Sequence, residues 1–280
     1  MNILITGGSG KIGKHLIPVL QKSGRFCYIL SRKNKENEFF RQGDLLDIDS
    51  LIKSLNNIDA VIHLAAKTHT DNASEYFLIN LEGTKNLIHA CEQTKVNKFI
   101  FISSYTASPD GGAYAKSKYQ TEEIIKKTDL NWIILKLSEV YGAGQSEAID
   151  LLKKNVKNHK IIFYPKHKGI YLRPISVNDA CFAINAALNS GFDKKTYLIA
   201  GPKRLDYRDL LLKIAEGQRK KIFLFPIPIF LIRITTFLLA PFGLSPIKKD
   251  QLDRLLVQKP FDISAAENDL NFHPKDFLNS

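Results

Sequence analysis

The sequence has few of the residues from which disulfide frameworks and metal centres are built. Of its 280 residues only three are cysteines, Cys27, Cys91 and Cys181, and each lies in an apolar stretch without CxxC spacing. This pattern predicts buried free thiols in a reducing compartment. The seven histidines include no HExxH pair, so we expect no metal site.

A leader segment is also lacking, because Met1 leads directly into the apolar run Asn2-Ile3-Leu4-Ile5. We therefore expect no signal peptide and a cytoplasmic protein. The most apolar stretch, residues 222–244, is interrupted by Arg233 and three prolines. A membrane-spanning helix needs about 20 uninterrupted apolar residues, so we do not expect this stretch to cross a membrane.

The same stretch predicts a helix that begins at Pro228 and runs to about Ala240. We expect this helix, with Phe230 and Phe237, to lie in the core of a C-terminal lobe. The alternative is a helix on a membrane surface, because the basic run 219–221 directly precedes it.

Acidic residues are in the minority: 28 Asp and Glu face 40 Lys and Arg, a net charge of +12. The basic residues are dispersed in small groups along the chain. Nucleic-acid surfaces usually concentrate charge and interleave it with aromatic residues, so nucleic acid is disfavoured as a partner. Diffuse basicity suits anionic small ligands or an acidic membrane surface.

The first half of the chain alternates short β-branched runs with amphipathic stretches, the pattern of a parallel sheet covered on both faces. The predicted strands are Asn2–Thr6, Phe26–Ser31, Asp59–Leu64, Lys98–Ser103 and Trp132–Lys136. The predicted helices are Lys11–Lys22, Ile48–Leu55, Ala73–Thr94 and Ala113–Lys127. The fold class is therefore α/β, a doubly wound Rossmann sheet.

After Lys136 this alternation loosens and prolines become frequent. We expect residues 1–136 to form an NAD(P)-binding Rossmann domain, completed by about 170–199. Residues 137–169 and 200–280 would then form a small substrate-binding lobe.

A glycine-rich turn, Thr6-Gly7-Gly8-Ser9-Gly10-Lys11-Ile12-Gly13, follows the first predicted strand. Gly7 permits the tight turn, and Gly10 lets the backbone approach a pyrophosphate. Gly13 lets the helix pack closely on the sheet, while the helix N-terminus, with Lys11 and Ile12, favours phosphate charge. We predict a dinucleotide-binding turn; a glycine turn without ligand is the alternative.

The second predicted strand ends Leu30-Ser31-Arg32-Lys33. An NAD site usually has an acid here, which accepts hydrogen bonds from the ribose 2′-hydroxyl. Arg32 instead suits a 2′-phosphate, with Ser31 beside it. We expect NADP(H) to be preferred over NAD(H), unless Arg32 is merely solvated.

Tyr114 and Lys118 are spaced four residues apart at a predicted helix start, so they share a face. A cation beside a phenol stabilises the phenolate, which makes the tyrosine usable as an acid or base near neutral pH. Ser104 follows a predicted strand and can hydrogen-bond a reacting oxygen. We predict that these three residues are catalytic; a solvated Tyr/Lys helix face is the alternative.

Directly after the predicted strand Trp132–Lys136, Leu137, Ser138 and Glu139 stand where ligands bind in such sheets, at the carboxyl ends of strands. They are candidates to touch nicotinamide and substrate: Leu137 on the cofactor side, Ser138 and Glu139 on the substrate side.

Several motifs occur in a fixed order along residues 1–185: the glycine turn, Gly43-Asp44-Leu45, His63-Leu64-Ala65-Ala66, Asn80 with Gly83-Thr84, Ser103-Ser104, Tyr114-Ala115-Lys116-Ser117-Lys118, Val140-Tyr141-Gly142 and Arg173-Pro174. This order resembles the extended short-chain dehydrogenases, the nucleotide-sugar epimerase/dehydratase group. The C-terminal part matches only loosely.

The resemblance implies roles at the matching positions. Asp44 and Leu45 would flank the adenine, and Asn80 would lie near the cofactor, as would Tyr114 and Lys118. Arg173 would bind a substrate diphosphate, unless it only caps the lobe through a surface carboxylate. The cofactor would also be lined by Leu64, Ala65 and Ala66.

Two departures from the family pattern bear on the reaction. The stretch from Ser104 to Tyr114 is shorter than in typical sugar epimerases and resembles atypical members, some of which bind NADPH as structural or assembly proteins without turnover. Tyr105-Thr106 stand where 4,6-dehydratases carry an Asp-Glu pair, so dehydration is disfavoured.

Three functions follow. The first is NADPH-linked reduction of a keto group on a nucleotide-linked or lipid-linked sugar, with Tyr114 as proton donor. The second is a nucleotide-sugar 4-epimerase with bound NAD. The third is a non-catalytic NADPH-binding assembly or redox-sensing module. The expected partner is a small-molecule, sugar-nucleotide substrate; a homodimer and peripheral membrane contact through 222–244 are left open.

Overall fold

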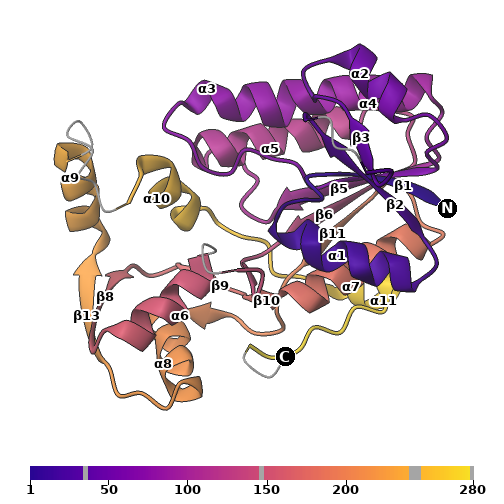
Figure 1. The fold of residues 1–280 in the computed structure, drawn as a ribbon. Helices are drawn as coiled ribbons and strands as arrows, with labels where there is room; N and C mark the ends of the chain where they lie inside the picture. Colours follow the sequence, from indigo (N-terminus) through magenta and orange to yellow (C-terminus); the bar gives the residue numbers. More distant parts are fainter. Residues whose placement is uncertain (34–36, 145–147, 240–246, 278–280) are drawn as a thin grey trace.

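The computed structural model describes residues 1–33, 37–144, 148–239 and 247–277. Its centre is a seven-stranded sheet in the order β11-β6-β5-β4-β1-β2-β3 (Figure 1). Every strand pair in it is parallel. The strands are β1 (Asn2–Thr6), β2 (Phe26–Ser31), β3 (Phe40–Gln42), β4 (Ala60–His63), β5 (Lys98–Ser104), β6 (Trp132–Leu137) and β11 (Lys195–Ile199).

Helices cover both faces of this sheet. Successive residues of a strand point to opposite faces, and because both sets are apolar, each face is buried under a helical layer. Ile3 and Ile5 of β1 pack in one core with α1 (Lys11–Lys22), α7 (Val177–Asn189) and α11 (Ser264–Leu270). Leu4 packs in a second core. The helical layer on that opposite face contains α2 (Ile48–Ser54), α3 (Ala73–Tyr76), the π-helical segment η1 (Phe77–Glu82), α4 (Gly83–Gln93) and α5 (Gly112–Ile125).

A second, smaller lobe has its own core and only short strands. Its ribbons pair β12 with β9 and β13 with β8, while β7 pairs with β10. The strands are β7 (Val140–Tyr141), β8 (Ile161–Lys166), β9 (Tyr171–Leu172), β10 (Ile175–Ser176), β12 (Leu205–Asp206) and β13 (Phe223–Pro228). The helices are α6 (Ala148–Asn158), α8 (Tyr207–Gly217), α9 (Ile229–Leu239) and α10 (Lys249–Leu256).

The Rossmann fold is confirmed, and the five predicted strands agree with β1, β2, β4, β5 and β6 to within one residue at each end. The helix predicted over Ala73–Thr94 is instead divided into α3, η1 and α4. All three cysteines are buried and free, as predicted.

The prediction that the apolar helix lies in the core is wrong. Residues 223–228 form β13, and α9 follows it, with Phe230 58% and Phe237 79% exposed. The predicted end of the helix at Ala240, and residues 241–244, lie outside the described residues. Within the described ranges, no helix is long and apolar enough to cross a membrane.

Candidate active site

The glycine turn lies at the carboxyl end of β1, where the strand order reverses between β4 and β2. Gly7 has a φ of +70°, and a Cβ on it would lie 2.7 Å from the backbone nitrogen of Ala65. Gly10 donates its N–H to the Gly7 carbonyl at 2.9 Å. A Cβ on Gly13 would lie 2.3 Å from the Gly8 carbonyl oxygen, so the turn and α1 must pack backbone to backbone.

This turn fits a dinucleotide diphosphate. Gly10 precedes α1 as its N-cap and, as a glycine, has no side chain to cap the first helical N–H groups. Those groups and the positive end of the helix dipole are suited to phosphate oxygens. Lys11 is the first residue of α1 and half-buried, whereas Ile12 packs against the sheet core.

The residues predicted on the adenosine side surround the ends of β2 and β3. Arg32 is exposed directly after β2, and the Ser31 hydroxyl donates to the Lys33 carbonyl at 3.0 Å. Asp44 is half-buried, with its carboxylate accepting from the Leu46 N–H at 3.0 Å. Leu45 is buried beneath them.

A buried histidine ties β1, β4 and α4 together. His63 Nδ1 lies 2.5 Å from the Thr6 hydroxyl, and its Nε2 lies 2.9 Å from the Thr84 hydroxyl. The Thr6 hydroxyl in turn accepts from the Ala65 N–H at 3.2 Å. Burial, helped by the charge of Lys118, lowers the pKa of His63 to about 3. The imidazole is therefore a neutral structural link beneath the segment 64–66.

Asn80 lies in the π-helical segment η1 with its side chain buried. Its Oδ1 accepts from the Lys67 N–H at 2.7 Å, and its Nδ2 donates to the Ser117 hydroxyl at 3.0 Å. Its carbonyl accepts from the hydroxyls of Thr84 and Thr121. These contacts fasten the loop after β4 to α5, so Asn80 positions the segment predicted to line the cofactor.

The three predicted catalytic residues come from β5 and the first turns of α5. Ser104 ends β5, and its hydroxyl lies 2.8 Å from that of Thr106. Tyr114 lies in the first turn of α5 and Lys118 one turn later. Lys118 is buried, with Nζ donating to the Ile102 carbonyl at 2.7 Å.

Burial lowers the pKa of Lys118 to about 7, against the opposing charge of Glu122. The ammonium also lies 4.1 Å from the centre of the Phe101 ring. Lys118 is thus held between α5 and β5 rather than in solvent, and the catalytic role of Tyr114 with Lys118 stays a prediction.

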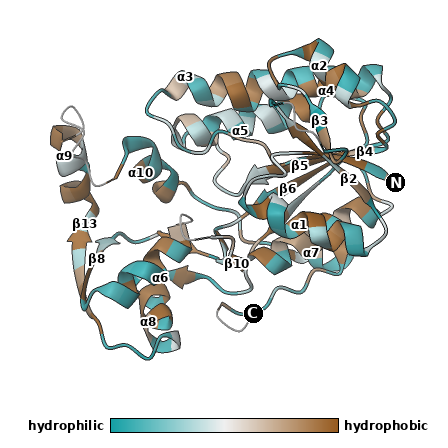
Figure 2. Cartoon of the chain, viewed as in Figure 1, coloured by the Kyte–Doolittle hydropathy of each residue, from teal (hydrophilic) through white to brown (hydrophobic). Residues whose placement is uncertain are grey.

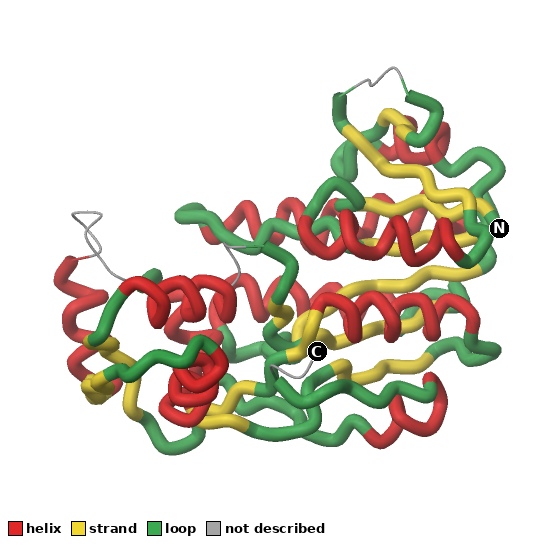
Figure 3. The backbone as a smooth tube through the Cα atoms, turned by 60° about the horizontal axis from the view of Figure 1, so that its bottom comes forward, coloured by secondary structure: helices red, strands yellow, loops and turns green. Residues whose placement is uncertain are grey.

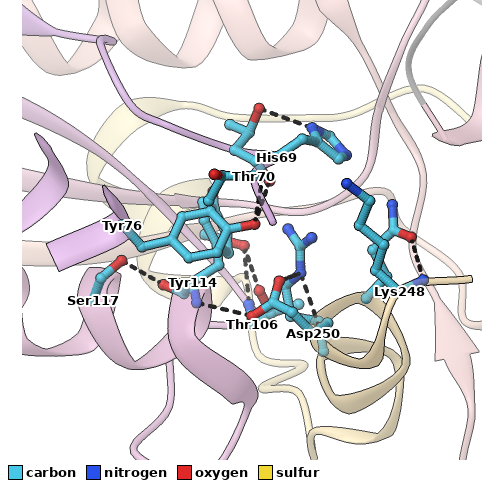
Figure 4. A network of polar contacts seen from close by, with 12 residues as sticks. His69, Thr70, Tyr76, Thr106, Tyr114, Ser117, Lys248 and Asp250 are labelled. Carbon is cyan, nitrogen blue, oxygen red and sulfur yellow. Dashed lines mark hydrogen bonds and ion pairs between the residues drawn. The ribbon is translucent and has the colours of Figure 1, made fainter. Parts of the chain in front are cut away.

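Helix α10 of the smaller lobe reaches Tyr114 (Figure 4). Asp250 accepts the Tyr114 backbone N–H at 3.0 Å, and the Arg254 guanidinium lies 4.5 Å from the centre of the Tyr114 ring. Asp250 and Arg254 form an ion pair at 3.1 Å. The Tyr76 ring contacts the Tyr114 ring edge-on, 5.7 Å between centroids. No motif in the sequence indicated that α10 belongs to the site.

The predicted substrate residues lie together, but their polar groups bind the protein itself. Arg173 is 4% exposed, and its guanidinium donates to the carbonyls of Gly201, Pro202 and Phe261. The Ser138 hydroxyl donates to the Arg173 carbonyl at 2.6 Å. Arg173 thus joins three segments, and neither a diphosphate nor a surface carboxylate is needed to explain its position. Leu137 is buried in the sheet core.

Glu139 belongs to a buried polar cluster that sequence reasoning did not find. The Tyr105 hydroxyl donates to its carboxylate, and Lys259 Nζ lies 3.7 Å from the same oxygen. Burial raises the pKa of Tyr105 well above its usual range and lowers that of Lys259. Tyr105 follows β5 and Glu139 follows β6, so the cluster lies at the carboxyl edge of the sheet.

Fold and site together define a Rossmann-fold protein of the short-chain dehydrogenase type. The model of the NAD dependent epimerase/dehydratase family matches residues 3–200. The chain belongs to this family, as its motifs predicted.

Curated relatives in this family differ in reaction. The chain is 26% identical to sterol-4-alpha-carboxylate 3-dehydrogenase, decarboxylating, of Dictyostelium discoideum, over 82% of this chain and 81% of the relative. It is 31% identical to the photosystem II assembly factor Ycf39 of Cyanophora paradoxa, over 81% and 72%. It is 28% identical to N-acetyl-alpha-D-glucosaminyl-diphospho-ditrans,octacis-undecaprenol 4-epimerase of Escherichia coli O157:H7, over 79% and 73%.

Solved structures share the fold at lower identity. UDP-glucuronic acid 4-epimerase of Bacillus cereus, in complex with UDP-glucuronic acid and NAD, has a TM-score of 0.77 and 22% identity. The match covers 99% of this chain and 95% of that chain.

Proposed function

We propose that the chain is an NAD(P)-dependent oxidoreductase that reduces a keto group on a nucleotide-linked or lipid-linked sugar. The observation that carries this proposal is Tyr114 at the start of α5, with the Arg254 guanidinium 4.5 Å from the centre of its ring, Lys118 one turn later on the same helix and Ser104 at the end of strand β5. Such a phenol can exchange a proton with a reacting oxygen near neutral pH.

A nicotinamide dinucleotide, when bound, would supply the hydride, and the glycine turn would hold its diphosphate through Gly7, Gly10 and the start of α1. Tyr114 then donates its phenolic proton to the alkoxide oxygen that forms from the keto group. Ser104 hydrogen-bonds the same oxygen. Lys118 and Arg254 stabilise the phenolate left on Tyr114, and solvent returns the proton. General acid catalysis of this kind typically contributes about 10²–10⁴-fold.

NADP(H) is the proposed cofactor because Arg32 is exposed at the end of β2, where its guanidinium can reach a 2′-phosphate. NAD(H) is the alternative, since a solved structure of the same fold is a complex with NAD.

Two other functions each have an observation in their favour. The E. coli relative is a 4-epimerase of a lipid-linked sugar, which favours an epimerase with bound NAD. The Cyanophora paradoxa relative is an assembly factor, and the short stretch from Ser104 to Tyr114 favours a non-catalytic module.

One experiment separates the three. The cofactor released from purified protein is identified by mass spectrometry, and the protein is then tested with a panel of keto-sugars linked to UDP, dTDP or a polyprenyl diphosphate. A reductase oxidises NADPH in proportion to product, with Tyr114→Phe inactive and Tyr119→Phe, on the same helix, active. Tightly held NAD with interconversion of C4 epimers and no net NADPH oxidation would contradict reduction. Binding of NADPH without turnover of any sugar would favour the assembly module.

A further inference from the structure

Strands β8 and β13 form a parallel ribbon with apolar side chains on both faces. Pairing places Phe223 beside Ile161 and Phe225 beside Phe163, and the last two rings are 5.8 Å apart. The alternate residues, Ile162 among them, pack inward against the lobe core. All four outward residues are exposed, Phe223 at 65%. One face of the ribbon is therefore an apolar surface without a cover in the described chain.

Helix α9, which follows β13 directly in the chain, also has an exposed apolar side. Its exposed residues recur with helical spacing along one side, while Thr236 on the opposite side is buried and the helix packs on β8, β13 and α10. Its exposed apolar residues are Phe230, Leu231, Ile234, Phe237 and Leu238.

Together these nine side chains, Ile161, Phe163, Phe223, Phe225 and the five of α9, form what we term the docking face. Figures 1 and 3 show β8, β13 and α9 at the end of the molecule far from the N-terminus, and Figure 2 shows the apolar colouring of β13 and α9. Contiguous apolar patches of this kind mark interaction sites on proteins.

The two segments that carry the docking face are basic and contain no acidic residue. Neither residues 151–178 nor residues 217–249 contain an aspartate or glutamate. The exposed basic residues of these segments include Lys157, Lys160, Lys166, Lys168, Arg219, Lys220, Lys221 and Arg233. A second copy of the chain would bring like charges together, whereas an anionic lipid surface would neutralise them.

We propose that the docking face binds the surface of an anionic lipid bilayer, with the phenylalanines in the interfacial region and the lysines and arginines at the headgroups. Helix α10 packs on α9 on one side and on α5 on the other, so a docked molecule has its candidate active site adjoining the membrane-bound element. This arrangement favours a lipid-linked over a nucleotide-linked sugar as the substrate. The inference about the substrate rests on the proposed function, whereas the docking itself does not.

Vesicle flotation of the full chain tests the docking. Vesicles of phosphatidylcholine alone are compared with vesicles containing about one third phosphatidylglycerol, at low and high salt. We expect binding to the anionic vesicles that weakens with salt. Phe223→Ser combined with Phe237→Ser should lower the partition coefficient about tenfold or more. The matched control is Phe26→Ser, a phenylalanine 64% exposed at the start of β2, which should bind as the wild type does.

Charge is tested with Lys221→Glu combined with Arg233→Glu, against Lys14→Glu combined with Lys22→Glu on α1. The first pair should lose flotation and the second should keep it. The proposal is overturned by a wild type that does not float, by binding that survives either test pair, or by a dimer in light scattering that the serine pair dissociates. Loss of folding in the serine pair, seen as a fall in Tm that Phe26→Ser does not share, would also overturn it.

The substrate step has its own readout. Addition of anionic vesicles should raise kcat/KM for a polyprenyl-diphosphate keto-sugar severalfold in the wild type but not in the serine pair. Docking without this rise contradicts the lipid-linked substrate alone, whereas absence of turnover of any keto-sugar contradicts the proposed function and leaves the docking result standing.

Discussion

The Rossmann sheet and the smaller lobe bury their apolar side chains to different degrees. In the sheet, Ile3, Leu4 and Ile5 are all fully buried, each under a helical layer. In the lobe, β8 and β13 alternate in the same way, yet only the inner residues have a cover within the described chain. The proposed catalytic residues lie in the Rossmann half, and the lobe contributes both the contacts of α10 with Tyr114 and an outward-facing apolar surface.

The largest expected effect tests whether the chemistry belongs to the sheet half. Tyr114→Phe should reduce kcat about 10²–10⁴-fold, because the phenolic proton is lost, while the Kd for NADPH changes little. Steady-state kinetics and cofactor titration measure the two quantities. Tyr119→Phe on the same helix is the control, and an undiminished kcat in Tyr114→Phe would remove the tyrosine from the mechanism.

The second prediction concerns the buried polar link of the sheet. The pKa of His63 is lowered to about 3 in the folded protein, from an ordinary value of 6.5. The unfolded chain therefore binds an extra proton between these pH values, and folding stability falls as pH decreases through this window. His63 should contribute about 1.4 kcal/mol of this loss for each pH unit.

Urea unfolding at pH 6.0, 5.0 and 4.0 measures this slope for the wild type and for His63→Gln. The variant removes the titrating group, so its slope should be smaller by about one proton. The same surface carboxylates titrate in both proteins, which makes the difference between the two slopes the diagnostic quantity. Parallel slopes would mean that His63 is protonated in the folded protein.

How much of the molecule could be predicted also differs between the two regions. The strands and the glycine turn follow from local patterns, since alternation, β-branched runs and glycine spacing are read within a few residues. The contact of Asp250 with Tyr114 spans 136 residues and depends on how the lobe folds over α5, for which no local signal exists. The apolar run at 222–244 does not by itself distinguish a core from a surface, because burial is decided by what packs against it.

Two site residues show the same limit. Asn80 lies within an apolar helical pattern. Nothing in that pattern predicts the π-helical segment in which its carbonyl accepts hydrogen bonds from two threonine hydroxyls. Arg173 has the charge expected of a residue that binds a diphosphate. In the structure its guanidinium donates to the carbonyls of three residues that are distant in sequence. Residue type alone could not distinguish a ligand from a structural cross-link.

The third prediction concerns the choice between NADP(H) and NAD(H) at the cofactor side of the sheet. Arg32→Asp should weaken NADPH binding by a factor on the order of 10 to 100 and improve NADH binding relative to it, because a carboxylate repels the 2′-phosphate and accepts from a ribose hydroxyl. Fluorescence titration with both cofactors measures the ratio. Lys33→Asp, the exposed neighbour, is the control for a general change in charge. Equal wild-type affinities would remove the NADP preference.

The smallest expected effect tests whether the lobe takes part in the chemistry at all. Arg254→Met keeps much of the packing volume against Tyr114 but removes the guanidinium 4.5 Å from its ring. Asp250 would also lose its ion-pair partner. The phenolate should therefore be less stable, with kcat about tenfold lower and the pH profile shifted toward alkaline pH.

Arg254→Lys separates electrostatics from packing, since it restores the charge without the planar group. A positioning role through Asp250 alone would leave the pH profile unchanged and would be reproduced by Asp250→Asn. An electrostatic role predicts that the lysine variant recovers the wild-type pH profile and part of kcat, with KM for the cofactor unaltered in every variant. If Arg254→Met matches the wild type in both kcat and pH profile, α10 only covers the tyrosine, and the chemistry belongs to the Rossmann half alone.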